Sequence, residues 1–133
     1  VAIRRMDEFV KGDLGFADIK PYDVDPGDFV NLVANAEMVL TDSFHGTMFS
    51  IYYHIPFFTF NYDVQGSKNS VNSRIDSIMK LLNIGDRRLS GMENVADCLK
   101  REINWDALQN RLDSFRAESE SYLVNALRDC KLL

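Results

Sequence analysis

The stretch that decides the fold is residues 38–47, which read Met-Val-Leu-Thr-Asp-Ser-Phe-His-Gly-Thr. Its first four residues form a short apolar run, which is typical of a buried strand. The polar residues 42–46 interrupt this run abruptly, and residues 47–54 follow with the pattern of a short helix. The stretch therefore predicts a strand, a tight loop and a helix in immediate succession.

The flanking residues continue this alternation of helix and strand. Upstream, Asp25 can cap a helix and Pro26 suits its first position, and an amphipathic helix of about three turns follows. Downstream, Ile55-Pro56 ends the next helix, and Phe57 to Phe60 predicts a second buried strand. Short apolar strands separated by helices indicate a parallel sheet covered on both faces. The expected fold class is α/β, a three-layer Rossmann-like domain with a small parallel sheet.

Further elements are predicted on either side of this centre. They are a short strand at 19–24, a polar loop at 61–73 that is either mobile or a plain connection, a helix with apolar residues from Val71 to Leu82, a turn at 85–88, and a helix at 90–99 with Ser90 and Glu93 in capping-box spacing. The last element is one long amphipathic helix over 104–130, about 40 Å long at about 1.5 Å per residue. The helix is longer than is needed to cover one small sheet. We therefore expect part of the helix's apolar stripe to pack on another domain or subunit.

The predicted core follows from the strands and the helix faces. In the sheet core we place Val39, Leu40, Phe57, Phe58 and Phe60. Replacing Leu40 with Asp is expected to prevent folding, because a buried carboxylate there would have no partner. The helical residues expected to pack against the sheet are Phe29, Leu32, Val33, Ile51, Ile75 and Ile78.

Composition narrows the class of protein. The chain has 133 residues, 46% hydrophobic and 11% aromatic, which is ordinary for one globular domain. A net charge of -5 argues against a general nucleic-acid or anionic-membrane surface, and no apolar run approaches the roughly 18 residues of a membrane span. For Cys98 and Cys130 we expect two buried thiols in a reducing compartment rather than a disulfide. The expected location is cytoplasmic.

Candidate chemistry lies at the junction of the first strand and its helix. Ligands of open α/β sheets bind at the carboxyl ends of strands, where helix N-termini hold anions. Gly46 would let a ligand approach the backbone, Ser43 and Thr47 offer hydroxyl groups, and His45 can donate to a phosphate or move a proton. The plainer alternatives are that Ser43 or Thr47 only caps the helix and that Asp42 bonds its own loop. His54 is interpreted as a helix-end residue.

Several charged residues have two interpretations. Lys68, Arg74, Arg87 and Arg88 are either solvated surface charges or ligands of an anion. Arg74 is the most informative, because a cation at a helix start is not stabilised by the helix dipole and indicates an acidic or phosphate partner. The acidic pattern at residues 23–25 predicts no metal site, because its last residue is needed as a helix cap. We expect no cofactor and no metal.

The combined pattern resembles one family of enzymes. Residues 25–29, the string Thr-Asp-Ser-Phe-His-Gly-Thr at 41–47, Ile55-Pro56-Phe57-Phe58, residues 72–75 and the opening of the last helix at 103–105 are similar to polysaccharide pyruvyl transferases. The resemblance extends over residues 20–130. It implies a GT-B-like architecture of two facing Rossmann-like domains. The chain, which begins at Val1, would be the carboxyl-terminal part of the second domain and inactive alone.

The resemblance also implies an activity and a site. Characterised relatives transfer a pyruvyl group from phosphoenolpyruvate to two sugar hydroxyls, forming a ketal in polysaccharide biosynthesis. His45 matches the family's motif histidine and is the candidate catalytic acid. Ser43, Phe44, Gly46 and Thr47 are the expected substrate-binding residues, with the start of the helix holding a phosphate or carboxylate.

The motif departs from the family at one position, where some members carry an arginine and this chain has Ser43. We hypothesise that Arg74 supplies the missing charge. The expected partners are phosphoenolpyruvate or a similar anionic donor, a saccharide acceptor, and the missing amino-terminal domain or a second subunit. Two alternatives remain open: a GT-B glycosyltransferase half that binds a nucleotide sugar, and a non-catalytic domain of the same fold.

Overall fold

The computed structural model describes residues 15, 17–19, 23–61, 72–91 and 93–130. Its sheet has three parallel strands in the order β1-β2-β3. The register pairs Val39 with Phe57, Thr41 with Thr59, and Thr59 with Arg88. The predicted α/β class with a small parallel sheet is confirmed. The strands are β1 (Val39–Thr41), β2 (Phe57–Phe60) and β3 (Arg88–Leu89).

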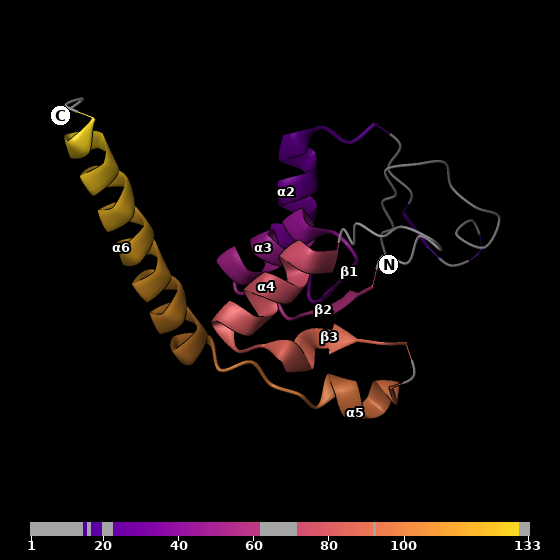
Figure 1. Ribbon diagram of the computed structural model, residues 1–133. Coiled ribbons are helices and arrows are strands. Elements are labelled where there is room, and N and C mark those ends of the chain that lie inside the picture. The colour runs from indigo at the N-terminus through magenta and orange to yellow at the C-terminus, as the bar shows by residue number, and fades with distance from the viewer. Residues whose placement is uncertain (1–14, 16, 20–22, 62–71, 92, 131–133) are drawn as a thin grey trace, which may run out of the picture.

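Helices cover both faces of the sheet, as expected for a Rossmann-like fold (Figure 1). One core cluster joins Phe57 of β2 to Ile51 and Ile75, on the face covered by α3 and α4. A second cluster joins Phe58 and Leu89 to Cys98 of α5, on the opposite face. The helices are α2 (Pro26–Ala34), α3 (Phe44–Tyr52), α4 (Asn72–Leu82), the 3-10 helix η1 (Gly85–Arg87), α5 (Val95–Leu99) and α6 (Trp105–Asp129).

The helix starts near the motif are set by short polar side chains. At α2, Asp25 Oδ1 accepts a hydrogen bond from the Asp28 amide at 2.8 Å, and Pro26 occupies the first turn, as predicted. At α3, Ser43 is the N-cap, so the helix begins three residues earlier than the apolar pattern indicates. The predicted site residues at 44–47 are therefore helical rather than part of a loop.

Two helix ends use left-handed residues other than glycine. His54 (φ 56°) follows α3, and its amide donates to Ile51 O at 3.2 Å. Asn83 (φ 55°) does the same after α4. The His54 ring stacks on Trp105 of α6 with centroids 4.9 Å apart, so this helix end also attaches α6 to the domain.

The core prediction is partly wrong at the strands. Phe57 and Phe58 are buried, while Val39 and Phe60 are half-buried. Leu40 is 61% exposed, because its side chain points to the α5 face and the short α5 covers only β2 and β3. Among the helical residues predicted to pack on the sheet, Val33, Ile51 and Ile75 are buried, and Phe29, Leu32 and Ile78 are half-buried.

Two local predictions are corrected between residues 85 and 99. Residues 85–87 of the expected turn form the single turn of η1, but strand β3 follows where no strand was expected, and α5 begins at Val95 with Asn94 as its cap rather than at Ser90. The Glu93 carboxylate instead accepts hydrogen bonds from the Ser90 amide and hydroxyl, both at 2.8 Å. These bonds lower the pKa of Glu93 to about 2. One half of the capping box, the bond from the Ser90 amide to the Glu93 carboxylate, thus forms in a loop.

Helix α6 extends beyond the sheet and the helices that cover it, as its length predicts. Leu108 and Leu112 are buried, but Phe115 is 41% exposed and Tyr122 is 78% exposed. Figure 1 shows α6 running away from the sheet. Both cysteines are free, Cys98 buried and Cys130 exposed at the end of α6, which corrects the expectation of two buried thiols.

Some predictions lie outside the described residues. The strand at 19–24 is described only at three positions, and the loop at 61–73 only at its two ends, where residues 72–73 are already helical. Lys68 is also outside. Within the described residues, no helix has the length and hydropathy needed to cross a membrane.

Candidate functional site

The predicted site begins where β1 ends. The Ser43 amide donates to Thr41 Oγ1 at 3.0 Å, and Ser43 Oγ accepts from the Gly46 amide at 3.3 Å. The loop is therefore held by Thr41 rather than by Asp42, which is exposed. The first amides of a helix have no carbonyl partner within it, so Phe44 and His45 present N–H groups at the carboxyl edge of the sheet.

Gly46 is required by packing. A Cβ atom at this position would lie 2.7 Å from Thr41 Oγ1 and 3.2 Å from Thr41 Cγ2. The residue is buried against β1, so the missing side chain lets α3 approach the strand. The space that the sequence suggested for a ligand is occupied by Thr41.

Thr47 also belongs to the helix–strand contact. Its side chain is fully buried, and its hydroxyl donates to Ser43 O at 3.0 Å. Together with the Ser43 cap, this bond fixes the first turn of α3. The hydroxyl groups of Ser43 and Thr47 therefore fix the start of α3. This agrees with the alternative that these residues cap the helix.

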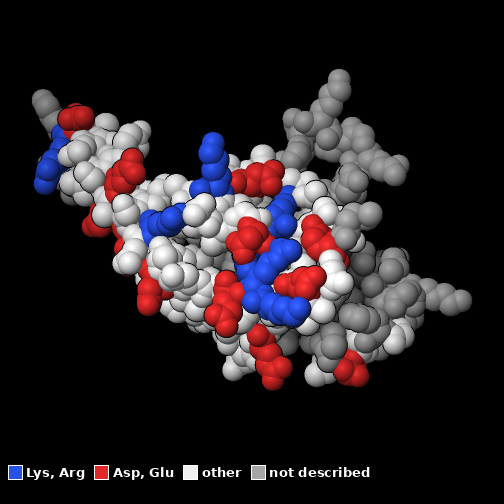
Figure 2. Space-filling model, turned by 90° about the horizontal axis from the view of Figure 1, so that it is seen from below, with Lys and Arg blue, Asp and Glu red and all other residues white. Residues whose placement is uncertain are grey.

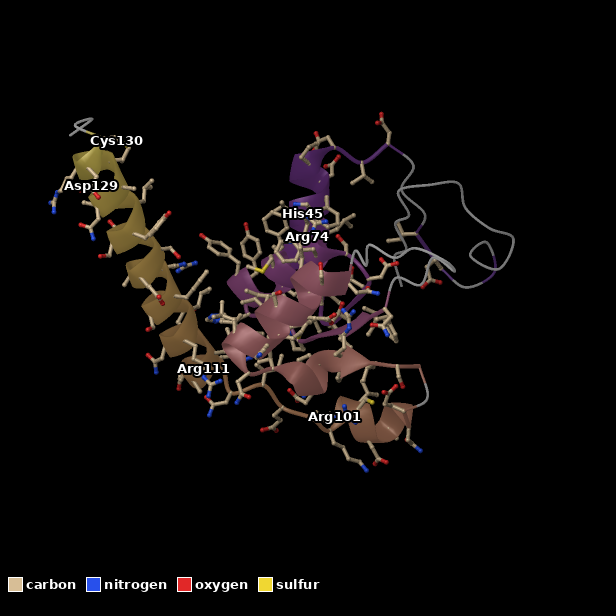
Figure 3. The ribbon with its side chains drawn as sticks, in the orientation of Figure 1. His45, Arg74, Arg101, Arg111, Asp129 and Cys130 are labelled. Atoms are coloured by element: carbon tan, nitrogen blue, oxygen red, sulfur yellow. The ribbon has the colours of Figure 1, made fainter. Side chains whose placement is uncertain are left out.

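Three predicted site residues meet at the surface. Arg74 Cζ lies 5.3 Å from the centre of the Phe44 ring, and the His45 ring packs edge-on against the same ring with centroids 5.9 Å apart. Both His45 and Arg74 are exposed. Figure 3 shows them close together, between α3 and the first turn of α4. The first turn of α4 thus places the Arg74 guanidinium against Phe44 of the motif.

The other candidate cations lie elsewhere. Arg87 is only 2% exposed; it pairs with Asp86, donates to Arg101 O at 2.8 Å, and lies 4.8 Å over the Phe58 ring. It is a structural residue. Arg88 approaches Asp76 of α4 at 3.4 Å.

A row of polar residues crosses the sheet; the sequence suggests only Arg88 among them as a candidate ligand of an anion and gives Thr41 and Thr59 no site role. Because of the strand register, Thr41, Thr59 and Arg88 stand side by side on the α3/α4 face; we call them the polar row. The one signal in the sequence is a threonine that interrupts the apolar run of Phe57 to Phe60. Its pairing with Arg88 depends on the formation of β3.

On the face of the molecule below the sheet, basic and acidic side chains alternate. Figure 2 shows the face below the sheet, where Lys and Arg side chains lie among carboxylates. Pairs such as Lys100 with Asp97 (3.0 Å) account for this. A cavity of about 370 Å³ lies at the amino-terminal ends of β1 and β2, away from His45. Its lining includes Met38, Pro56 and Phe58. Across the described ranges, His, Cys, Asp and Glu form no group suited to a metal ion.

Comparison with known proteins gives one match. The family model described as polysaccharide pyruvyl transferase matches residues 2–64, just under half of the chain. This span begins before the region of resemblance, which starts at residue 20, and includes the whole 41–47 string, but it ends well before residue 130, where that region ends. Searches of curated proteins and of solved structures found no match. The family resemblance predicted from the sequence is therefore confirmed: residues 2–64 match the polysaccharide pyruvyl transferase family.

Proposed function

We propose that this chain carries the donor half of an enzyme that transfers a pyruvyl group from phosphoenolpyruvate to two hydroxyls of a saccharide. The family match over residues 2–64 supports a transferase role in polysaccharide biosynthesis. The observation that carries the finer assignment is the placement of Arg74 over Phe44, beside His45, at the start of α3. A proton donor, a cation and free helix amides meet there.

The reaction makes two demands on the site. The methylene carbon of the donor takes up a proton and becomes a methyl group, which leaves an oxocarbenium-like centre at the neighbouring carbon. One sugar oxygen bonds to this carbon, the bond to the phosphate oxygen breaks, and a second sugar oxygen completes the ketal. One of the two hydroxyl protons replaces the proton consumed, and the other leaves with the phosphate. The site must therefore supply an acid and hold anionic groups.

The side chains divide these tasks. His45 is exposed and donates the proton, because a protonated imidazole is a general acid that can transfer its N–H proton to the donor. The amides of Phe44 and His45 and the Arg74 guanidinium bind an acidic group of the donor. Stacking on Phe44 holds the guanidinium next to the helix start. Ser43, Gly46 and Thr47 fix that helix start on β1.

The rest of the assembly is part of the same proposal. We infer that the 133-residue domain is the carboxyl-terminal half of a cytoplasmic GT-B-like enzyme. The saccharide acceptor would be held jointly with a facing amino-terminal domain or a second subunit. The exposed apolar stripe of α6, including Phe115 and Tyr122, supports a partner surface of this kind. The isolated domain would then bind donor without turnover.

The test is a titration followed by backbone amide NMR. Phosphoenolpyruvate is expected to give saturable shifts at Phe44 and His45, and Arg74→Ala should weaken its binding about tenfold, the usual size of one charged hydrogen bond. Arg116→Ala is the matched control, because Arg116 is half-exposed on α6 and forms its ion pair with Asp113 of the same helix. Equal binding by the Arg74→Ala and parent chains would refute the role of Arg74. Saturable shifts with a nucleotide sugar alone would favour the glycosyltransferase alternative.

A further inference from the structure

The α3/α4 face of the sheet changes character along the strands. Val39 and Phe57 form an apolar pair that packs with Ile51 and Ile75. Two residues further on, side chains return to the same face, because they alternate along a strand. There the polar row replaces the apolar pair. The face is thus apolar under the helices and polar at the carboxyl ends of the strands, where α/β proteins bind ligands.

Two members of the polar row lack hydrogen-bond partners within the part of the chain that the structure describes. Thr59 is 0% exposed, and its Oγ1 atom has none. Nη1 and Nη2 of Arg88 are also closed off from solvent without a hydrogen bond. Nη2 has only an ion-pair contact with Asp76 Oδ1 at 3.4 Å. Buried donors are nearly always paired, so these groups indicate a missing acceptor.

The neighbouring residue shows that this fold can satisfy a buried arginine. Arg87 donates from Nε and Nη2 to Asp86 and from Nη1 to the Arg101 carbonyl. Arg88 is the next residue and has no such set of acceptors. Its unpaired nitrogens are therefore not a general consequence of an arginine in this part of the sheet.

We infer that Thr59 and Arg88 form a second oxyanion subsite, which binds a phosphate or carboxylate group between the sheet and the first turns of α3 and α4. The two residues are register partners, so their backbones lie about 4.8 Å apart and both side chains face the same way. A hydroxyl and a planar guanidinium on the same face of the sheet can both donate to the oxygens of one acidic group.

The subsite is connected to the first one through the same elements. Thr41, at the other end of the polar row, contacts Gly46 at the start of α3, and Arg88 contacts α4, which carries Arg74. Asp76 is exposed, so the Arg88 guanidinium lies one side chain below the surface. The identity of the ligand rests on the proposed function: phosphoenolpyruvate has a phosphate and a carboxylate, and each subsite would take one of them.

Inorganic phosphate is the probe, titrated calorimetrically into the chain carrying Arg74→Ala so that the first subsite is weakened. Thr59→Val in this background should lower the phosphate affinity about tenfold. The same change should leave the melting temperature unchanged or higher, because valine has the same shape and removes an unpaired buried hydroxyl. Arg88→Gln should lower the affinity further, and Arg116→Gln is the control with unchanged affinity.

The outcomes separate the subsite from the proposed function. Equal phosphate affinity with and without Thr59→Val, or no saturable phosphate binding in the Arg74→Ala chain, would overturn the subsite. If phosphate binding depends on Thr59 and Arg88 while phosphoenolpyruvate does not compete with it, the subsite stands and the proposed donor is wrong. If phosphoenolpyruvate binds the parent and Thr59→Val chains equally well, the donor assignment stands and the subsite is overturned.

Discussion

Replacing Gly46 with alanine would place a methyl group where Thr41 already lies. The added Cβ would be 2.7 Å from Thr41 Oγ1, 3.2 Å from its Cγ2 and 3.3 Å from its Cβ. The obstacle is the short β-branched side chain of a strand residue, which has little freedom to move aside. Relief therefore requires α3 to move away from β1, or Thr41 to turn and give up its hydrogen bond with the Ser43 amide.

The expected cost is the difference between two effects. Overpacking of a well-packed contact costs about 1–3 kcal/mol, whereas alanine in a helix is favoured over glycine by up to about 1 kcal/mol. The net result should be a loss of about 1–2 kcal/mol in the free energy of unfolding. For a chain of 133 residues this corresponds to a fall of about 4–7 °C in the melting temperature.

Urea unfolding followed by circular dichroism measures this loss. Gly85→Ala is the matched control, because a Cβ at Gly85 meets nothing within 4 Å. In a Thr41→Ala background the penalty of Gly46→Ala should nearly disappear, since the two closest atoms are gone, so the double-mutant cycle isolates the contact. A Gly46→Ala chain as stable as the parent would refute the packing explanation and would return the glycine to the role of admitting a ligand.

Three further outcomes follow from the described residues. Leu40→Asp should fold and lose less than about 1 kcal/mol in chemical unfolding, because Leu40 is 61% exposed; an unfolded variant would refute that placement. Asn83→Ala should lose about 1 kcal/mol or more, because Asn83 has φ 55°, whereas Asn83→Gly should be neutral; equal losses would argue against backbone strain. The hydrogen bonds that hold the pKa of Glu93 near 2 should stabilise the chain above about pH 4.5 and be lost as the pH falls toward 2, so the melting-temperature gap to Glu93→Gln should narrow there; a constant gap would contradict this.

The features that the sequence predicts well have local causes. The start of α2 follows from Asp25 and Pro26, and the extent of α6 follows from its apolar period. Leu40 is different, because an apolar residue in a parallel strand is buried only where a helix covers it. Coverage depends on the length and position of α5, which no residue near β1 specifies.

The capping-box prediction failed for a related reason. Ser90 and Glu93 have the spacing of a helix start and make one of its hydrogen bonds, from the Ser90 amide to the Glu93 carboxylate. This bond forms without any helix, because the carboxylate also accepts from the Gly91 amide at 2.9 Å. Asn94 then offers a better cap four residues later, and α5 starts there. A local pattern fixes its own hydrogen bonds, whereas the element that follows depends on competing caps.

The candidate site also contains residues that the local sequence suggests and residues whose pairing depends on the fold. Ser43 and His45 are contiguous in the sequence, so a single string suggests them. The sequence indicates Arg74 because a cation at a helix start is not stabilised by the helix dipole. In the structure its partner is the aromatic ring of Phe44.

Thr59 and Arg88 belong together only through the register of β2 and β3. In the sequence, Thr59 is a small interruption of an apolar run and Arg88 is one of two adjacent arginines, and each has an ordinary explanation. Pairing them in the sheet changes both explanations, because two unsatisfied buried donors on one face need a shared acceptor. The apolar pair beneath them already packs the sheet against its helices. A structural role would be served as well by valine at position 59, so the hydroxyl is better explained by what it binds than by what it packs against.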